Sequence, residues 1–479
     1  MKANQISFDY SRESITEGIL HFGVGNFHRA HLECYTNALL KENDQNSWGV
    51  CGAMIMPQDQ KLYSALKSQD GVYSLTICGR DGQNEVQWIG SLVNLLWSGE
   101  DLEAIINKVA EPNIRIISLT ITEGGYNIDK ASGEFILDSE AIAHDLKNPS
   151  SPTTVFGIVA EGLRRRAAAG AGALTILSCD NLQHNGNTCA RAFSTFFAAQ
   201  DTLLAQWADE NITYPNSMVD RITPATTPAD VERINKELDC ADAAPVYCED
   251  FIQWVVEDNF AAGRPEWERV GVEFTDDVAP YENMKLSLLN ASHTLLSYPS
   301  MLSGYRKVDQ AMRDERIIKF VRDFMDKDAT PYVPAPGTTN LEVYKQTLVE
   351  RFANSAVSDQ IARLCGDGAS KFPVYVVPIA KKMVAAGDDL TRIAYLVAAY
   401  RHYLKFKIDD AGVSFDIFDP WISADDWAII DSTNAMAFLG TSPFAAVDLA
   451  SHQPFVELYK SMVKMIAERG AMATLESIL

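Results

Sequence analysis

Three polar side chains that could take part in catalysis stand close together within residues 280–305. They are Lys285, Asn290 and His293, and the apolar spacing around them predicts a helix over 281–297 that ends or bends at Pro299. At about 100° per residue the three side chains would lie near 0°, 140° and 80°, on one broad face of that helix. Such a face would offer a base, an amide and an imidazole to one sugar-sized molecule. A surface lysine and a core histidine are the alternative.

The N-terminal stretch has the order of elements of a dinucleotide-binding unit. Residues 17–25 predict a buried strand that enters a glycine turn at Gly23 and Gly25, followed by a helix over 26–40 and a strand over 48–56. Asp59 follows that second strand, where a carboxylate accepts hydrogen bonds from ribose hydroxyls and repels the extra phosphate of NADP. The third glycine of the fingerprint is missing, so a simple tight turn and a helix N-cap role for Asp59 are the alternatives.

Polar residues follow two further predicted strands of the same sheet. The strand over 114–122 leads into a polar glycine loop that contains Glu123, and the strand over 173–178 is followed by Asn181. Ligands of open α/β sheets bind at the carboxyl ends of strands, so these residues and the glycine turn are expected to meet at one crevice. The other expected elements of this half are strands over 72–78 and 86–92 as a hairpin on the sheet, strands over 219–223 and 247–256, and helices over 101–110, 152–169 and 187–207.

After residue 276 only helical patterns remain, near 281–297, 308–327, 341–353, 357–365, 374–386, 389–406, 424–437 and 453–468. We therefore expect an α/β protein with a dinucleotide-binding domain over 1–278 and an all-helical, substrate-binding domain over 279–479 that carries Lys285. A cleft between two such domains is the expected place for a substrate.

Composition excludes several classes of partner. The net charge of −23 over 479 residues argues against binding nucleic acid or anionic membrane. Eight scattered cysteines without C-x-x-C spacing indicate reduced thiols, and the first ten residues lack the apolar core of a signal peptide, so a cytoplasmic protein is expected. His28 and His31 have no acid or cysteine at ligand spacing, which predicts no metal site.

Several motifs, in the same order and with matching spacing, resemble the polyol-specific long-chain dehydrogenase/reductase family, and within it the enzymes that act on mannitol. The motifs are G-V-G-N-F-H-R-A-H (23–31), S-L-T-I-T-E-G-G-Y (118–126), S-C-D-N-L-x-H-N-G (178–186), M-V-D-R-I-T-P (218–224) and K-x-x-x-x-N-x-S-H (285–293). The resemblance extends over nearly the whole chain.

This resemblance implies an extended Rossmann-type domain, an all-α domain and a zinc-independent, monomeric NAD-dependent enzyme that interconverts a polyol and its 2-ketose. D-mannitol and D-fructose are the expected pair, with D-arabinitol and D-xylulose as a related one. The roles that it implies are a general base (Lys285), amides that hold the reacting oxygen (Asn181 and Asn290), a substrate-orienting imidazole (His293), polyol-site residues (Asp220, Arg363 and Lys371), proton-relay acids (Glu123 and Glu282) and cofactor contacts (Gly23, Gly25, Asn26, Phe27, His28, Arg29 and Asp59).

Physical chemistry agrees with these roles. A lysine serves as base near neutral pH only if desolvation lowers its pKa, and neutral amides stabilise an alkoxide without trapping it. The sequence departs from the family pattern at one residue that concerns the cofactor. Two adjacent acids often follow the second strand in mannitol dehydrogenases, but here Gln58 precedes Asp59, so the strictness of the preference for NAD over NADP stays open.

Two other functions remain. A hexuronate reductase acting on fructuronate or tagaturonate would use Arg363 or Lys371 for the substrate carboxylate. A non-catalytic nucleotide or sugar sensor would have lost the base and amides, which are all present. Outside the resemblance, Asp220 reads as an ion-pair partner of Arg221, and Arg363 and Lys371 as helix C-terminal charges.

Overall fold

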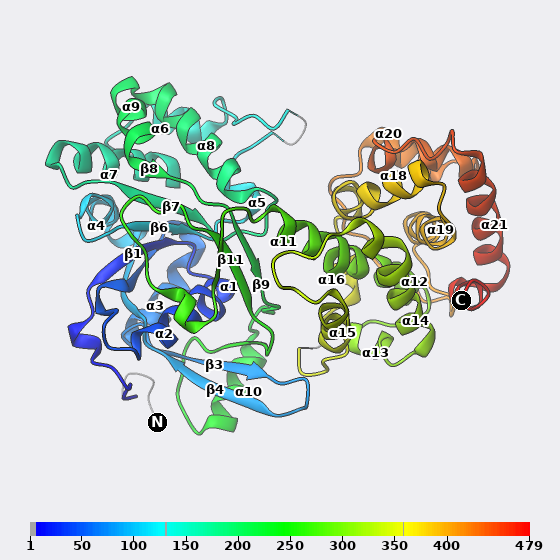
Figure 1. The fold of residues 1–479 in the computed structure, drawn as a ribbon, viewed down its shortest axis with the longest axis horizontal. Coiled ribbons are helices and arrows are strands. Elements are labelled where there is room, and N and C mark those ends of the chain that lie inside the picture. Colours follow the sequence, from blue (N-terminus) through cyan, green and yellow to red (C-terminus); the bar gives the residue numbers. More distant parts are fainter. Residues whose placement is uncertain (1–5, 130–131, 358) are drawn as a thin grey trace. The chain divides into compact units, whose positions relative to one another are not determined.

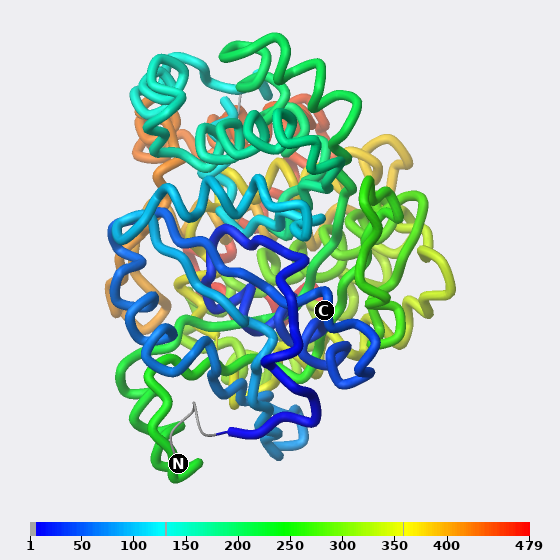
Figure 2. The backbone as a smooth tube through the Cα atoms, turned by 90° about the vertical axis from the view of Figure 1, so that its left-hand side faces the viewer, coloured from blue at the N-terminus to red at the C-terminus, as the bar shows by residue number. Residues whose placement is uncertain are grey.

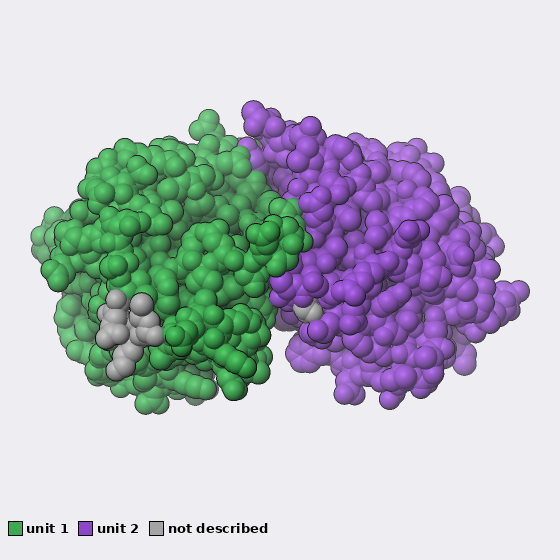
Figure 3. Space-filling view, turned by 90° about the horizontal axis from the view of Figure 1, so that it is seen from below, with its two compact units in different colours: residues 1–279 green, residues 280–479 purple. Residues whose placement is uncertain are grey.

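The computed structural model describes residues 6–129, 132–357 and 359–479, which divide into two units coloured separately in Figure 3. Unit 1 ends at Ala279 and contains strands and helices, whereas unit 2, from Pro280 to Leu479, is helical (Figure 1). Residues 1–5, part of the segment in which we expect no signal peptide, lie outside the described residues. Among the described helices, none has the length and apolar character needed to cross a bilayer.

A six-stranded parallel sheet lies at the centre of unit 1, with the strand order β5-β2-β1-β6-β7-β8. Its strands are β1 (Glu17–Phe22), β2 (Gly49–Met54), β5 (Leu92–Trp97), β6 (Ile116–Leu119), β7 (Leu174–Ser178) and β8 (Ile212–Thr213). Numbered within this sheet alone, the order is that of the Rossmann fold, which reverses between its first and fourth strands. Here the reversal falls between β1 and β6, and a ligand crevice is expected at their carboxyl ends.

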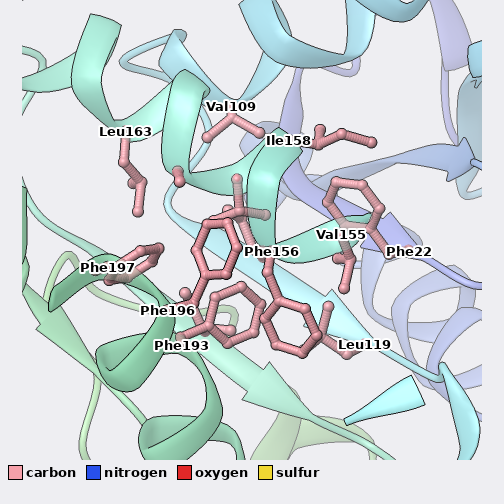
Figure 4. Close-up of a cluster of buried hydrophobic side chains, with 14 of the residues drawn as sticks. Phe22, Val109, Leu119, Val155, Phe156, Ile158, Leu163, Phe193, Phe196 and Phe197 are labelled. Atoms are coloured by element: carbon pink, nitrogen blue, oxygen red, sulfur yellow. The ribbon is translucent and has the colours of Figure 1, made fainter. Parts of the chain in front are cut away.

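Alternate residues of the strands point to opposite faces, and helices cover both. Leu20 and Phe22 face a core formed with α4 (Ser98–Ala110), α7 (Val155–Ala169) and α8 (Asn185–Gln200). Phe156 packs there on Phe193 and Phe196 (Figure 4).

The opposite face is covered by other helices. Ile19 and Val50 pack there against α2 (Leu32–Leu40) and α3 (Gln60–Ser68). On the first face, the face of Leu20 and Phe22, helices α6 (Glu140–Lys147) to α9 (Thr202–Asn211) gather together, as Figures 1 and 2 show. The sheet is therefore a fully covered middle layer.

Two three-stranded sheets flank this layer and correct part of the expected topology. The predicted hairpin, β3 (Tyr73–Cys78) and β4 (Asn84–Ile89), is antiparallel but pairs with β10 (Val246–Glu249) in a sheet of its own. The second sheet contains β9 (Ser217–Asp220), β11 (Gln253–Glu257) and β12 (Glu273–Thr275). The single strand expected over 247–256 is thus two strands, β10 and β11, in different sheets.

Two long helices expected in unit 1 are each broken. The first consists of α1 (Asn26–Ala30) and α2, because His31 has φ −118° and ψ −83°. The second consists of α8 and α9, because Asp201 is extended and its carboxylate caps α9 by accepting the N–H groups of Leu203 and Leu204. A side chain that caps a helix start competes with continuation of the preceding helix.

Helix α12 (Ala291–Leu302) is the centre of unit 2, since nearly all its residues are buried. It continues through Pro299, where an end or bend was expected, and Tyr298 packs on Phe372, Tyr400 and Tyr403. The helices around it are α11 (Ala279–Met284), α13 (Val308–Ala311), α14 (Glu315–Asp323), α15 (Leu341–Phe352), α16 (Ile361–Cys365), α17 (Gly368–Lys371), α18 (Val377–Ala386), α19 (Thr391–Phe406), α20 (Ala424–Asp431), α21 (Gln453–Arg469) and α22 (Ala471–Glu476). Helix α10 (Pro228–Leu238) belongs to unit 1.

Candidate active site

A cavity of about 1090 Å³ lies at the carboxyl ends of β1, β2 and β6 in unit 1. Its walls include Gly23, Gly25 and Asp59 from the predicted nucleotide unit, together with Thr122 and Gly124. The start of α7 closes another side. The position at the reversal of strand order is where open α/β sheets bind their ligands.

The two glycines of the turn serve different purposes. Gly23 has φ +97°, and a Cβ on it would meet the Thr120 carbonyl oxygen at 2.1 Å, so only glycine fits the path of the chain. A Cβ on Gly25 would meet nothing closer than the Gly23 oxygen at 3.8 Å. A Cβ on Gly124 would meet no atom within 4 Å. Gly25 and Gly124 thus leave open space, which allows a ligand to approach the backbone closely.

Asp59 lies in the cavity wall at the end of a 3₁₀ turn, Pro57–Asp59. Its Oδ2 accepts the Met56 N–H at 2.9 Å, which fixes the carboxylate. Asp59 also occupies the N-cap position of α3, but its side chain makes no capping hydrogen bond there. Gln58 lines the cavity beside it.

The side chains of residues 26–29 hold α1 against the rest of unit 1. Asn26 donates to Pro224 O at 3.0 Å and accepts from Arg29, whose guanidinium also donates to Ala244 O. His28 is fully buried, and Phe27 packs into the core beside His31. A cofactor role for this segment therefore stays a prediction, and it concerns the backbone N–H groups at the start of α1.

The polar segment after β6 is a single helical turn, α5 (Thr122–Gly125), and not the expected loop. Asp180, which follows β7, accepts the N–H groups of Ile121 and Thr122 at 3.0 and 2.8 Å, and the Tyr126 hydroxyl at 2.8 Å. These bonds hold Thr122 at φ +65°, an uncommon backbone angle for threonine.

The hydrogen bonds of Asp180 join the segment after β6 to the segment after β7. The two predicted residues of the region lie at these neighbouring strand ends. Glu123 and Asn181 are both exposed there. Asp220 lies at the end of β9, in another sheet, and is buried, while Arg221 donates to the carbonyls of Ala30 and Glu249.

In unit 2 the expected α-helix over 281–297 contains a π-helical segment, Lys285–Asn290. Lys285 begins this segment and Asn290 ends it, so the angles calculated at about 100° per residue are wrong for them, because i→i+5 hydrogen bonds widen the turn. π-Helical turns are rare and occur often at functional sites.

The side chains around this segment are largely enclosed. Glu282 and Lys285 are 5% and 7% exposed. The Asn290 Oδ1 is buried and has no hydrogen-bond partner within the described part of the chain. His293 packs its ring on Phe352 of α15, with centroids 4.4 Å apart. A buried amide oxygen left without a partner is costly unless a ligand or water satisfies it.

Lys371 and Arg363 are both engaged by their neighbours. Lys371 Nζ donates to the carbonyl oxygens of Leu364 and Gly366 at 3.1 and 2.6 Å, at the C-terminal end of α16. Arg363 pairs with Asp359 through two hydrogen bonds. The contacts of Lys371 match the alternative in which it compensates a helix end, whereas Arg363 pairs with a carboxylate that precedes α16 and remains exposed.

Sequence patterns missed other cavity residues, including Thr120, Thr154 and Ser98. Thr154 carried a usable signal, because it is the N-cap of α7 and precedes an apolar run. No group of three or more His, Cys, Asp or Glu side chains in the described ranges is arranged to hold a metal ion. The eight cysteines are free thiols.

Two family profiles match the chain. Residues 17–269 match the mannitol dehydrogenase Rossmann domain, and residues 277–467 match the mannitol dehydrogenase C-terminal domain. Together these matches cover most of both units.

Relatives of known activity align over most of their length. The Pseudomonas fluorescens mannitol 2-dehydrogenase, solved as a ternary complex with NAD and D-mannitol, is 40% identical, with a TM-score of 0.87 and coverage of 100% of this chain and 99% of that one. A polyol:NADP oxidoreductase of Gluconobacter oxydans is 40% identical over 88% of this chain and 86% of the relative. The D-mannonate oxidoreductase of Escherichia coli is 36% identical over 97% of this chain and 96% of the relative.

Proposed function

The chain belongs to the mannitol dehydrogenase family of oxidoreductases, and we propose that it is an NAD-dependent, metal-independent enzyme interconverting a polyol and its 2-ketose. D-mannitol and D-fructose are the proposed pair, with D-arabinitol and D-xylulose as a related one. We also propose a monomeric cytoplasmic protein that binds neither nucleic acid nor membrane, in keeping with the net charge of −23.

The residues of the unit 1 cavity fit a dinucleotide. Gly25 and Gly124 leave space for a pyrophosphate against the backbone, and Asp59 offers an anchored carboxylate to the adenosine ribose. The cavity volume of about 1090 Å³ is of the size that large cofactors need. Bound NAD supplies the hydride acceptor, and the protein supplies orientation and electrostatics.

The proton chemistry is assigned to residues of this chain. Lys285 takes the hydroxyl proton of the polyol, and its burial favours the neutral amine that a base requires. Asn181 and Asn290 donate hydrogen bonds to the oxygen as it gains alkoxide character. The Asn290 amide oxygen, buried without a partner among the described residues, supports a ligand at this position, since a sugar hydroxyl can donate to it.

Other predicted residues have supporting roles. Glu282 and Glu123 are proposed to relay the proton from Lys285 to water. His293, Asp220, Arg363 and Lys371 are proposed to bind the remaining hydroxyls of the polyol.

One observation supports the choice of a neutral substrate: Arg363 and Lys371, the cations proposed for a substrate carboxylate, already have polar partners within the protein. Arg363 is paired with Asp359, and Lys371 donates to main-chain carbonyls. A hexuronate such as fructuronate or tagaturonate would have to displace one of these contacts. The alternative nevertheless has support, because the D-mannonate oxidoreductase relative acts, by its name, on a sugar acid.

The deciding experiment measures NADH and NADPH oxidation by the purified protein with fructose, xylulose, fructuronate and tagaturonate in parallel. Turnover of fructose, alone or with xylulose, supports the polyol proposal. Turnover restricted to the uronates assigns Arg363 or Lys371 to the carboxylate and overturns it. A preference for NADPH would contradict the role of Asp59 in rejecting the extra phosphate. Binding of NADH without turnover of any ketose or polyol would favour the sensor.

A further inference from the structure

Three hydrogen-bond donors converge on the carbonyl oxygen of Gly23, in the glycine turn of the cavity. The Gly25 N–H donates at 2.7 Å and the Thr120 hydroxyl at 2.6 Å. The third is His21 Nε2 at 3.2 Å, which also lies 2.9 Å from Thr120 Oγ1. One carbonyl that accepts from three donors has a fixed direction, here towards the buried ring of His21.

The protonation state of His21 follows from these partners. A carbonyl oxygen only accepts, so the proton of a neutral imidazole is on Nε2. His21 Nδ1 is then an acceptor and takes the hydrogen bond of the Ser118 hydroxyl at 2.8 Å. Burial, then the nearby His28, lowers the pKa of His21 well below its ordinary value, so the ring stays neutral.

His21 also fixes the helix that follows the turn. Its ring stacks on His28 of α1, with centroids 3.4 Å apart and planes 9° from parallel. His28 Nε2 is in turn 3.0 Å from Glu33 Oε1. One imidazole from β1 therefore contacts β6, the glycine turn and α1.

We propose that His21, with Thr120, is a positioning residue for the dinucleotide: it turns the Gly23 carbonyl away from the cavity. A carbonyl oxygen facing a pyrophosphate would repel it, whereas a carbonyl held towards His21 leaves the N–H groups at the start of α1 for the anion. His21 itself is not in the cavity wall, so its effect on the cofactor acts through the turn. This inference rests on the proposed function for the identity of the ligand.

The test is NADH binding, followed by fluorescence titration, together with hydrogen exchange of the peptide that spans Gly23. Thr120→Val removes one donor while keeping the side-chain shape, and His21→Met removes the ring. Each is expected to raise the Kd for NADH about three- to tenfold, the effect of one lost hydrogen bond, and to speed exchange in the turn. Thr120→Ser and His21→Gln retain a donor and should restore much of the affinity.

Thr175→Val is the matched control. It removes a buried hydroxyl, hydrogen-bonded to Thr213, from the N-terminal end of β7, which is the end opposite the cavity. The KM for the ketose should stay at the wild-type value in every variant, because the substrate-binding groups are untouched. If His21→Met does not fold, Thr120→Val and the exchange rate decide the matter.

Wild-type Kd and exchange in a folded Thr120→Val protein would overturn the inference, as would a Thr120→Ser protein as weak as Thr120→Val. A wild-type protein that binds neither NADH nor NADPH would instead overturn the proposed function, and this inference with it.

Discussion

The guanidinium of Arg363 donates to both carboxylate oxygens of Asp359, four residues earlier, with Nε 2.8 Å from Oδ1. Burial opposes ionisation of Asp359, but the hydrogen bonds and charge of Arg363, and the charge of His293, hold its pKa below the ordinary value. One carboxylate is thus influenced by two side chains that are proposed to bind substrate, so its replacement tests their roles.

Asp359→Asn should raise the KM for the ketose about five- to tenfold and change kcat little, because Arg363 loses a charged, bidentate partner that fixes its orientation. Steady-state kinetics with saturating NADH measure both constants. Asp258→Asn is the control, since it breaks a similar bidentate pair with Arg264 in unit 1. A fall in kcat at unchanged KM would contradict an orienting role in substrate binding.

Lys371→Met should lower the free energy of unfolding by about 1–3 kcal/mol, because it leaves the carbonyls at the end of α16 without their charged donor. Urea unfolding measures this change. The same variant separates structure from binding: a stability loss with unchanged KM assigns Lys371 to the helix end alone, whereas a raised KM in addition supports a place in the polyol site. Lys371→Arg keeps the charge and should lose less stability.

Lys285→Ala should lower kcat for polyol oxidation about a hundredfold to ten-thousandfold, the range expected for loss of a general base, while the Kd for NADH stays unchanged. The control is Lys345→Ala, another buried lysine of unit 2, which is paired with Asp326 and Glu342. Oxidation near the wild-type rate in a folded Lys285→Ala protein would remove the lysine from the mechanism.

Glu33 should make stability depend on pH. Burial raises the pKa of its carboxyl from 4.5 to about 8, so the folded protein keeps a proton that the unfolded chain loses between those values. The contribution of Glu33 to the free energy of unfolding is therefore fully present below pH 4.5. It falls as pH rises towards about 8, by up to about 1.4 kcal/mol per pH unit.

Glu33→Gln cannot ionise and should abolish that slope, as measured by urea unfolding at a series of pH values. Glu100→Gln is the control, since hydrogen bonds from Lys67 and Tyr63 lower the pKa of Glu100 and place its titration below the window. An identical slope in the wild type and in Glu33→Gln would contradict the assignment to Glu33.

The sequence by itself identified the elements that depend on short-range patterns. The run into Gly23 and Gly25 predicted the first strand and turn, because apolar continuity and glycine spacing are local properties. The change to purely helical patterns predicted the α/β and all-α halves for the same reason. The resemblance carried by five motifs supplied the family, which the two family profiles confirm.

Only the tertiary structure decided how distant groups meet. The assignment of the β3–β4 hairpin and of β10 and β11 to separate sheets depends on pairing partners far along the chain. The π-helical segment at Lys285 has no distinct sequence period, since it changes hydrogen bonding within an otherwise helical stretch. The contact between His21 and Thr120 joins residues 99 positions apart, and Lys371 meets carbonyls through the fold of α16 and α17. Such contacts arise from packing across elements, which no local pattern encodes.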